Sequence, residues 1–270
     1  MRTAVVQMCS TDDLAKNLEA AEAFVREAAG LGAELVALPE NFAFLRREGQ
    51  PVPCRQGLDG EIVGRARDWA RELGVWLLAG TFPELVPGDD VRFHNTSVLV
   101  SAAGEIAGVY RKIHLFDVDL SDGGGGAYRE SENVAPGHEL VVADTPFGAL
   151  GLSVCYDVRF PELYRAMADR GARFLAVPSA FTPHTGKDHW EVLLRARAIE
   201  NQAFVLAPAQ AGRHGPDRAS YGRSMIIDPW GLVLAQAADR PGVIVADCRA
   251  EDLERIRAGL PALRHRRFQP

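Results

Sequence analysis

Hydrophobic positions along the chain alternate between short continuous runs and stretches with a helical repeat. The short runs are rich in aliphatic and β-branched residues and predict strands at residues 4–8, 35–38, 75–79, 96–100, 148–154, 174–177, 204–207, 224–227 and 243–246. Strands that are wholly apolar, such as 35–38 and 174–177, are expected to be covered on both faces. The pattern therefore predicts sheets with a layer of structure on each side.

Three segments between these runs carry apolar residues at helical spacing, and we expect the third helix near residues 188–202. The apolar positions are Leu14, Leu18, Ala21, Val25 and Ala28 in the first segment, Ile62, Ala66, Trp69, Ala70 and Leu73 in the second, and Trp190, Leu194 and Ala198 in the third. Each segment shows one apolar stripe, which is typical of a helix that covers one face of a sheet. We predict a layered α/β fold with helices outside sheets. The pattern does not distinguish a single three-layer sheet from two sheets packed face to face.

Length and composition agree with one globular domain. The chain has 270 residues, of which 47% are hydrophobic and 24% charged, and no linker rich in Pro, Gly or Ser divides it. We expect a single domain over residues 1–270. The low-complexity stretch at 119–127, with glycines at 123–126, predicts a flexible loop.

The charge pattern and the cysteines narrow the possible partners. The formal net charge is −6 with acids and bases interspersed, so we expect neither nucleic acid nor membrane as a partner, and a small molecule becomes the default. The sequence shows no signal peptide and no membrane-spanning run, which favours a cytoplasmic protein. Cys9, Cys54, Cys155 and Cys248 are far apart, which argues against a zinc site and a disulfide framework.

Cys155 ends an apolar run and is followed at once by polar sequence. This pattern predicts a buried strand that delivers a thiol to a strand-to-helix corner. A helix beginning at Pro161, with Glu162 behind it, would point backbone N–H groups toward the sulfur and favour the thiolate. The alternative is that Cys155 is a small buried hydrophobic residue.

Two other apolar segments also end in polar side chains that could take part in catalysis. Glu40 follows the run 35–38, and Lys112 lies in the apolar segment 109–116. Only three of the 30 basic residues are lysines, Lys16, Lys112 and Lys187, so a lysine here is unusual. A carboxylate that takes a proton, a cation that holds an oxyanion and a thiol that attacks are the groups needed for acyl transfer through a thioester.

Each of these residues has a simpler interpretation when taken alone. Glu40 could be an exposed acid at a strand end, and Lys112 could pair with a surface carboxylate. His114 is a rival base for a Cys–His dyad, although a histidine between apolar residues is more often structural. The combination of the three strand ends favours a catalytic site.

Three motifs resemble those of the nitrilase superfamily of carbon–nitrogen hydrolases. They are Leu38-Pro-Glu40-Asn41, Tyr110-Arg-Lys112-Ile-His114 and Val154-Cys155-Tyr156-Asp157. The resemblance continues through Tyr128-Arg-Glu130 and through segments 178–181, 186–201 and 219–231, so it covers nearly the whole chain. The later segments are most similar to the branch of amidases that hydrolyse deaminated glutathione to 2-oxoglutarate and cysteinylglycine.

The resemblance implies a role for each motif residue. Glu40 would be the general base and Cys155 the nucleophile. Lys112, together with the backbone N–H of Tyr156, would hold the oxyanion, and Glu130 would position Lys112. His114 would be structural.

The resemblance also implies the architecture and the partners. The family fold is a four-layer α-β-β-α sandwich, and its members usually pair into larger assemblies, so we expect a homodimer or a higher homo-oligomer. The family chemistry needs no cofactor and no metal. The expected substrate is a small-molecule amide.

Substrate-binding residues are less well defined by the sequence. Arg159 is a candidate for binding a substrate carboxylate, but it could equally pair with Asp157 or Glu162. Phe181 could line the acyl pocket or belong to the core. An ω-amidase or N-carbamoyl amidase that releases ammonia is the main alternative function. A non-catalytic scaffold with the same fold is a further alternative, which the presence of Glu40, Lys112, Glu130 and Cys155 disfavours.

Overall fold

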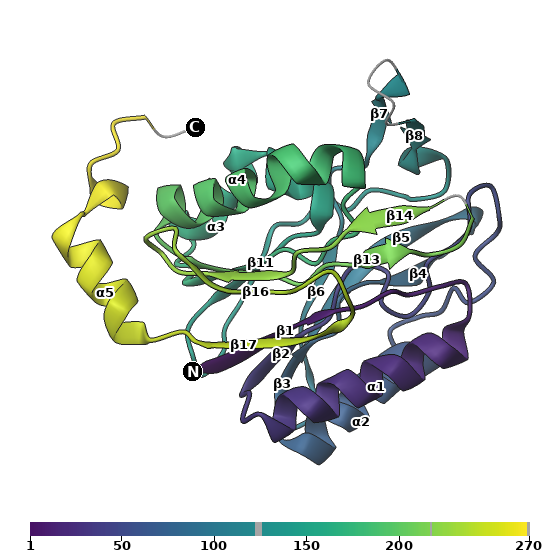
Figure 1. Cartoon of the computed structure of the whole chain (residues 1–270), viewed down its shortest axis with the longest axis horizontal. Helices are drawn as coiled ribbons and strands as arrows, with labels where there is room; N and C mark the ends of the chain where they lie inside the picture. The colour runs from purple at the N-terminus through teal and green to yellow at the C-terminus, as the bar shows by residue number, and fades with distance from the viewer. Residues whose placement is uncertain (122–125, 217, 269–270) are drawn as a thin grey trace.

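Two sheets lie face to face between two layers of helices in the computed structural model, which describes residues 1–121, 126–216 and 218–268 (Figure 1). Helices α1 (Leu14–Gly30) and α2 (Glu61–Leu73) cover one outer face, and α3 (Pro161–Asp169) and α4 (Pro183–Asn201) cover the other. This arrangement confirms the layered α/β prediction and the four-layer α-β-β-α sandwich.

The first sheet has seven strands. Its order is β17-β1-β2-β3-β5-β4, and β6 also pairs with β5. The strands are β1 (Arg2–Gln7), β2 (Leu35–Ala37), β3 (Trp76–Leu78), β4 (Phe82–Val86), β5 (Asp89–Val100), β6 (Ile106–Arg111) and β17 (Gly242–Asp247). Strands β1, β2 and β3 are parallel, and the other pairs are antiparallel.

The second sheet has six strands in the order β16-β15-β12-β11-β10-β9. They are β9 (Val141–Ala143), β10 (Leu150–Leu152), β11 (Phe174–Ala176), β12 (Phe204–Ala207), β15 (Met225–Ile227) and β16 (Val233–Gln236). Strands β10, β11 and β12 are parallel, so their carboxyl ends lie at one edge.

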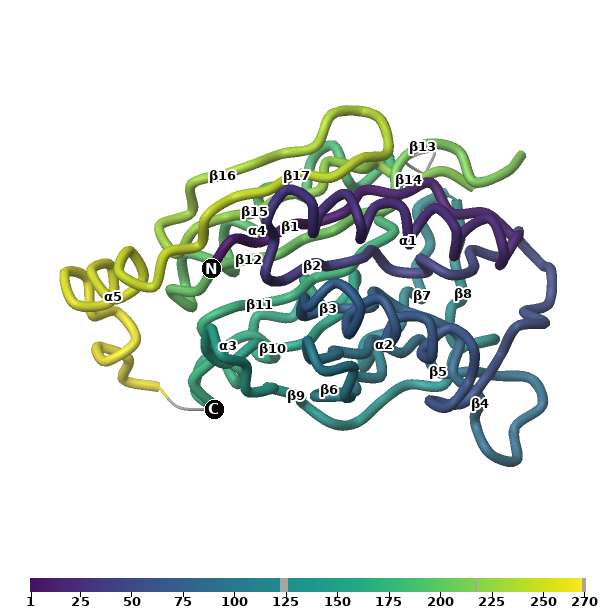
Figure 2. Tube along the Cα trace, turned by 90° about the horizontal axis from the view of Figure 1, so that it is seen from below, coloured from purple at the N-terminus to yellow at the C-terminus, as the bar shows by residue number. Residues whose placement is uncertain are grey.

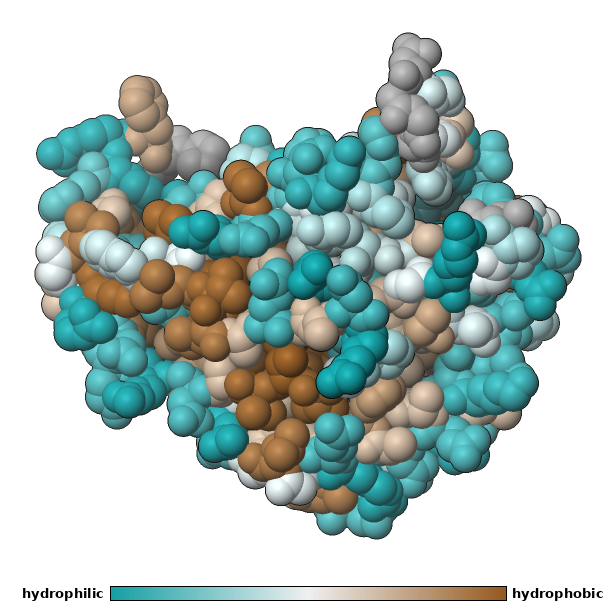
Figure 3. Space-filling model, in the orientation of Figure 1, coloured by the Kyte–Doolittle hydropathy of each residue, from teal (hydrophilic) through white to brown (hydrophobic). Residues whose placement is uncertain are grey.

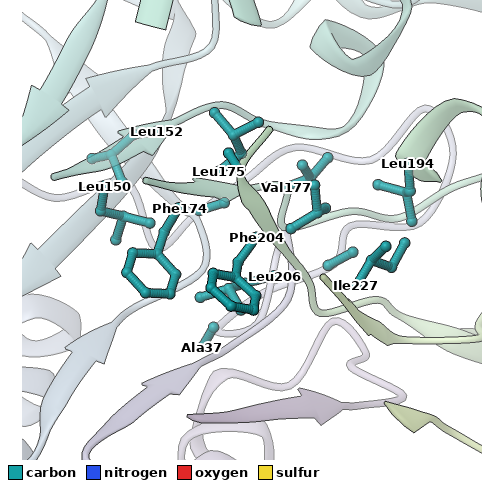
Figure 4. Close-up of a cluster of buried hydrophobic side chains, with 14 of the residues drawn as sticks. Ala37, Leu150, Leu152, Phe174, Leu175, Val177, Leu194, Phe204, Leu206 and Ile227 are labelled. Carbon is teal, nitrogen blue, oxygen red and sulfur yellow. The ribbon is translucent and has the colours of Figure 1, made fainter. Parts of the chain in front are cut away.

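The alternation of side chains along β2 explains why the central strands are apolar throughout. Leu35 and Ala37 belong to the core cluster that contains the second sheet, whereas Val36 and Leu38 belong to the cluster beneath α1 and α2. Successive strand residues point to opposite faces, so a sheet buried on both faces needs apolar residues at every position. Figure 4 shows Ala37 near side chains of β10, β11 and β12.

Several elements lie outside the sandwich. Two small hairpins form from β7 (Asp117–Asp119) with β8 (Ala127–Arg129) and from β13 (Ala211–Arg213) with β14 (Ala219–Tyr221). The β7–β8 hairpin stands out from the body, and α5 (Ala250–Gly259) lies at the opposite end of the molecule (Figures 1 and 2). The predicted flexible loop includes residues 122–125, which lie outside the described residues.

The sequence pattern placed one helix start too late and missed several strands. Helix α4 begins at Pro183, where the Thr182 hydroxyl accepts a hydrogen bond from the Thr185 N–H, not near residue 188 as predicted. A Thr cap followed by Pro is a strong helix start. Strands β4, β6, β9 and β16 were not predicted, and none of them is buried along its whole length. Within the described residues, none of the helices has the length and apolar character needed to cross a membrane.

Candidate active site

Cys155 lies where the chain leaves β10 and turns sharply. Its backbone has a φ of 49°, in the left-handed region that a residue with a side chain rarely adopts. The Cys155 N–H donates to the carbonyl of Pro178 at 2.9 Å, which holds the corner against the segment that follows β11. The side chain is 8% exposed. The predicted corner is therefore present, and it turns the thiol into a buried pocket.

Asp157 holds this corner and connects it to the neighbouring segment that carries Lys112. Its buried carboxylate accepts hydrogen bonds from the Val154 N–H at 2.8 Å and the Tyr110 hydroxyl at 2.7 Å. It also accepts from the backbone N–H of His114 at 3.1 Å and from His114 Nδ1 at 2.7 Å. The His114 ring stacks on Phe160, with centroids 3.7 Å apart. His114 thus has a structural role. From the sequence, Asp157 was part of the cysteine motif and a possible partner of Arg159, but its four hydrogen bonds were not predicted.

Lys112 follows the last residue of β6 and is 2% exposed. Its Nζ donates to Glu40 Oε1 at 3.1 Å and to Glu130 Oε1 and Oε2 at 2.9 and 2.8 Å. Burial opposes the charge on Lys112, but the charges of Glu130 and Glu40 outweigh it and raise the pKa of the ammonium well above its usual range. The lysine is therefore a fixed cation.

Glu40 is buried three residues beyond the end of β2 and is held by several donors. Oε1 accepts from Lys112 and from Asn95 Nδ2 at 2.8 Å, and Oε2 accepts from the Ala180 N–H at 2.7 Å. The Gln210 side chain donates to the Glu40 backbone carbonyl at 2.9 Å. Ordered donors on both oxygens fix the direction of the carboxylate.

The protonation state of Cys155 differs from the one that the sequence predicted. Burial, followed by the charge of Glu40, raises the pKa of the Cys155 thiol well above its usual range, while Lys112 acts in the opposite direction. Helix α3 begins at Pro161 as predicted, but a 3₁₀ turn over residues Cys155–Arg159 lies between it and the strand that carries the sulfur. The thiolate prediction was wrong. The resting group is a thiol beside a carboxylate.

A cavity of about 120 Å³ opens onto this group. Six of the seven site residues from the sequence line it: Glu40, Lys112, Glu130, Cys155, Tyr156 and Phe181. Phe181 is also a core residue, since it is 4% exposed and packs on Trp190 with centroids 5.1 Å apart. Phe181 therefore belongs to the core and also lines the cavity, and its role in an acyl pocket stays a prediction.

Arg159 is the exception among these residues. It is not among the described residues that line the cavity, and its guanidinium lies over the rings of Phe181 at 5.2 Å and Tyr156 at 5.7 Å. Its Nη1 lies 3.3 Å from His189 Nδ1. Among the described residues, Arg159 forms no ion pair with Asp157 or Glu162. Its proposed contact with a substrate carboxylate stays a prediction.

Sequence reasoning missed other residues of the cavity wall. Asn95 lines it, and its Oδ1 is buried without a hydrogen-bond partner among the described residues. Arg46, Arg129, Tyr128 and Arg218 also line the wall. Their segments give no periodic signal, and only the fold brings them together. Within the described part of the chain, no cluster of three or more His, Cys, Asp or Glu side chains could hold a metal ion.

Comparisons with known proteins agree with this geometry. The model of the carbon–nitrogen hydrolase family matches residues 2–258. A protein of Synechocystis sp. named deaminated glutathione amidase is 45% identical over 267 residues, which cover 98% of this chain and 97% of the relative.

Solved structures show the same similarity. The crystal structure of the NitFhit protein of C. elegans superposes with a TM-score of 0.90 at 40% identity, covering 98% of this chain and 65% of that one. An amidase from Nesterenkonia sp. AN1, in which acrylamide has added to the active site cysteine, superposes with a TM-score of 0.75 at 28% identity, covering 97% and 98% of the two chains.

Proposed function

Because the chain belongs to the carbon–nitrogen hydrolase family, we propose that it hydrolyses deaminated glutathione to 2-oxoglutarate and cysteinylglycine. The observation that carries the chemistry is the buried Lys112 ammonium, which bridges Glu40 and Glu130 in the cavity that contains the Cys155 thiol. The name and the 45% identity of the Synechocystis relative support the choice of substrate.

Acylation begins with the thiol as a proton donor. Glu40 takes the Sγ proton while the sulfur attacks the amide carbon, so no free thiolate needs to accumulate. The resulting oxyanion is held by the Lys112 ammonium and by the backbone N–H of Tyr156. When the tetrahedral intermediate collapses, the C–N bond breaks and the amine leaves with the proton from Glu40. A thioester of 2-oxoglutarate remains on Cys155.

Deacylation repeats these steps with water. Glu40 takes a proton from water, and the hydroxide attacks the thioester carbon while Lys112 again holds the oxyanion. The C–S bond then breaks, Cys155 recovers the proton from Glu40, and 2-oxoglutarate leaves.

Glu130 acts through Lys112 as a positioning residue. Both of its oxygens accept hydrogen bonds from the Lys112 ammonium, and the Phe116 N–H donates to Oε2 at 2.7 Å. This pair fixes the ammonium in place and leaves Glu40 to exchange protons with the substrate groups.

We further propose that the protein assembles into a homodimer or higher homo-oligomer and is cytoplasmic. Exposed apolar residues gather on three neighbouring elements. Ile199 on α4 is 48% exposed, Trp230 and Leu232 in the turn between β15 and β16 are each 56% exposed, and Leu234 on β16 is 41% exposed. Figure 3 shows apolar surface over the face where β16 and β17 lie. An apolar patch of this kind is typical of a protein interface. Light scattering should show an oligomer, and Leu234→Glu should shift the mass toward the monomer.

Product analysis tests the proposed function. The purified enzyme is incubated with deaminated glutathione, and 2-oxoglutarate and cysteinylglycine are quantified by mass spectrometry, with Cys155→Ala as the inactive control. We expect both products in equal amounts from the wild-type enzyme. Turnover of 2-oxoglutaramate or a carbamoyl amino acid to ammonium, without cleavage of deaminated glutathione, would replace this proposal with an ω-amidase or N-carbamoyl amidase. Turnover by Cys155→Ala would exclude the mechanism.

A further inference from the structure

Three arginines that the catalytic mechanism does not use, Arg46, Arg129 and Arg218, line the wall of the same cavity, and Arg46 and Arg218 are hydrogen-bonded to each other. Arg46 belongs to the long segment between β2 and α2, and Arg218 lies just before β14. They are 172 residues apart in sequence, yet Arg218 Nη1 donates to the backbone carbonyl of Arg46 at 3.1 Å. The fold therefore brings two cationic side chains together beside the nucleophile.

Neither Arg46 nor Arg218 has a carboxylate within ion-pair distance among the described residues. Within the described chain, the one hydrogen bond that the Arg46 guanidinium donates goes to the carbonyl of Gln50 at 3.2 Å. The adjacent Arg47 behaves differently, because it pairs with Asp12 at 2.7 Å and does not line this cavity. Arg46 and Arg218 thus retain guanidinium N–H groups that can bind an anion.

The electrostatics of Arg46 also favour a bound anion. Burial lowers the pKa of Arg46, and the nearby charge of Arg218 lowers it further, in opposition to Glu48 and Glu130. An anion between the two guanidinium groups would offset both the lost hydration and the mutual repulsion.

The charges of Glu40, Lys112 and Glu130 explain why a carboxylate substrate would need further cations in this cavity. Glu40 and Glu130 carry two negative charges against the single positive charge of Lys112, and Cys155 rests as a thiol. This net negative charge repels an incoming carboxylate. A substrate that carries carboxylates therefore needs positive charge elsewhere in the cavity.

We propose that Arg46 and Arg218 form a subsite that binds a substrate carboxylate remote from the scissile amide. Guanidinium groups suit this task because they bind carboxylates with two parallel hydrogen bonds. This inference rests on the proposed function, whose substrate has one carboxylate on the 2-oxo acyl part and another on the glycine of the leaving group. The subsite would make the enzyme selective for anionic amides.

A protection experiment tests the subsite without relying on turnover. The dicarboxylate product 2-oxoglutarate is titrated against alkylation of Cys155 by iodoacetamide, and peptide mapping separates Cys155 from the other cysteines. We expect protection in the wild-type enzyme. The concentration for half protection should rise at least about 10-fold in both Arg46→Gln and Arg218→Gln. Arg47→Gln, which removes a neighbouring arginine outside the cavity, should match the wild type.

Two variants on separate segments keep the test decisive if one of them fails to fold. The inference is overturned if 2-oxoglutarate does not protect the wild-type enzyme. It is also overturned if the folded variants are protected as well as the wild type, or if Arg47→Gln loses protection to the same extent.

Two substrates then identify which carboxylate is bound. Deaminated glutathione carries both carboxylates, whereas 2-oxoglutaramate carries only the acyl one. An equal fall in kcat/KM for both substrates supports binding of the 2-oxo acid carboxylate, whereas a fall for deaminated glutathione alone would overturn it, because 2-oxoglutarate and 2-oxoglutaramate have no glycine carboxylate. Unchanged kcat/KM for both would overturn the inference. Failure of the wild type to cleave deaminated glutathione would instead remove the proposed function, and the protection result would still stand.

Discussion

The side-chain amide of Asn95 donates a hydrogen bond to Oε1 of Glu40 over 2.8 Å, while its own Oδ1 stays buried without a partner among the described residues. Asn95 comes from β5, and Glu40 follows β2. A buried amide that donates a hydrogen bond to the proposed general base orients that carboxylate.

Replacing Asn95 should therefore impair catalysis in two separable ways. Asn95→Ala removes the hydrogen bond and should lower kcat by about 10-fold. Asn95→Asp also adds a negative charge beside Glu40, so its kcat/KM should fall further and the acidic limb of the pH profile should move to higher pH. Steady-state kinetics between pH 5 and 9 measure both effects. Identical pH profiles for the two variants would contradict the expected effect of the added negative charge on Glu40.

Alkylation of Cys155 should report its raised pKa. Because burial and Glu40 disfavour the thiolate, the rate of Cys155 alkylation by iodoacetamide should keep rising with pH above the range of an ordinary thiol. Glu40→Gln removes the negative charge and should move the profile to lower pH. A plateau near neutral pH in the wild type would show that the thiolate is the resting form.

The packing of Gly80 against the chain before Glu40 should tolerate no side chain. A Cβ on Gly80 would lie 2.0 Å from the Pro39 carbonyl oxygen, and the backbone has a φ of +33°. Gly80→Ala should lower the free energy of unfolding by about 3 kcal/mol or more, and it should lower kcat because it displaces Glu40. Gly64→Ala is the matched control, since it lies in α2 with no atom within 4 Å of the added Cβ. That variant should be stabilised by about 0.5–1 kcal/mol. Thermal unfolding compares them.

Asp157 should contribute more to stability than a surface acid. The Asp157 carboxylate accepts four hydrogen bonds, and Asp157→Asn replaces one of its oxygens with an NH₂ group that cannot accept. We expect the free energy of unfolding to fall by about 2–3 kcal/mol. The melting temperature should fall by roughly 5–10 °C. Asp144→Asn, at an exposed position, should change it little. Equal melting temperatures for the two variants would show that the network does not hold the corner.

His214 should make the protein less stable in acid. Burial is the main cause that lowers the pKa of His214 to about 4, and its ring lies 2.9 Å from the Ser10 carbonyl and 2.8 Å from Ser220 Oγ. An unfolded histidine has a pKa near 6.5, so the unfolded state binds the extra proton between pH 4 and 6.5. Neutral, buried His214 therefore contributes its full share to the free energy of unfolding above pH 6.5. As the pH falls from 6.5 to 4, about 3 kcal/mol of that stability is lost.

Urea unfolding at several pH values measures this loss. His214→Gln should make the free energy of unfolding less dependent on pH between pH 4 and 6.5. An unchanged slope in that variant would assign the acid sensitivity to other groups.

The sequence by itself determined the layers, the strand ends and the reacting groups. Runs of apolar residues predict buried strands because a sheet covered on both faces leaves no polar position, and this placed Glu40 and Cys155 at strand ends, with Lys112 inside another apolar segment. The motif resemblance added Glu130 and Tyr156, which also line the cavity. These features are local, so a linear pattern records them.

The tertiary structure decided what surrounds those groups. Asn95, Arg46 and Arg218 carry no periodic signal, and they reach the site from segments far apart in the chain. The state of Cys155 also depended on the fold, because burial and the charge of Glu40 outweigh the helix that follows. Desolvation and charge–charge interactions depend on distances in space, and for that reason the sequence predicted Cys155 as the nucleophile but not its protonation state.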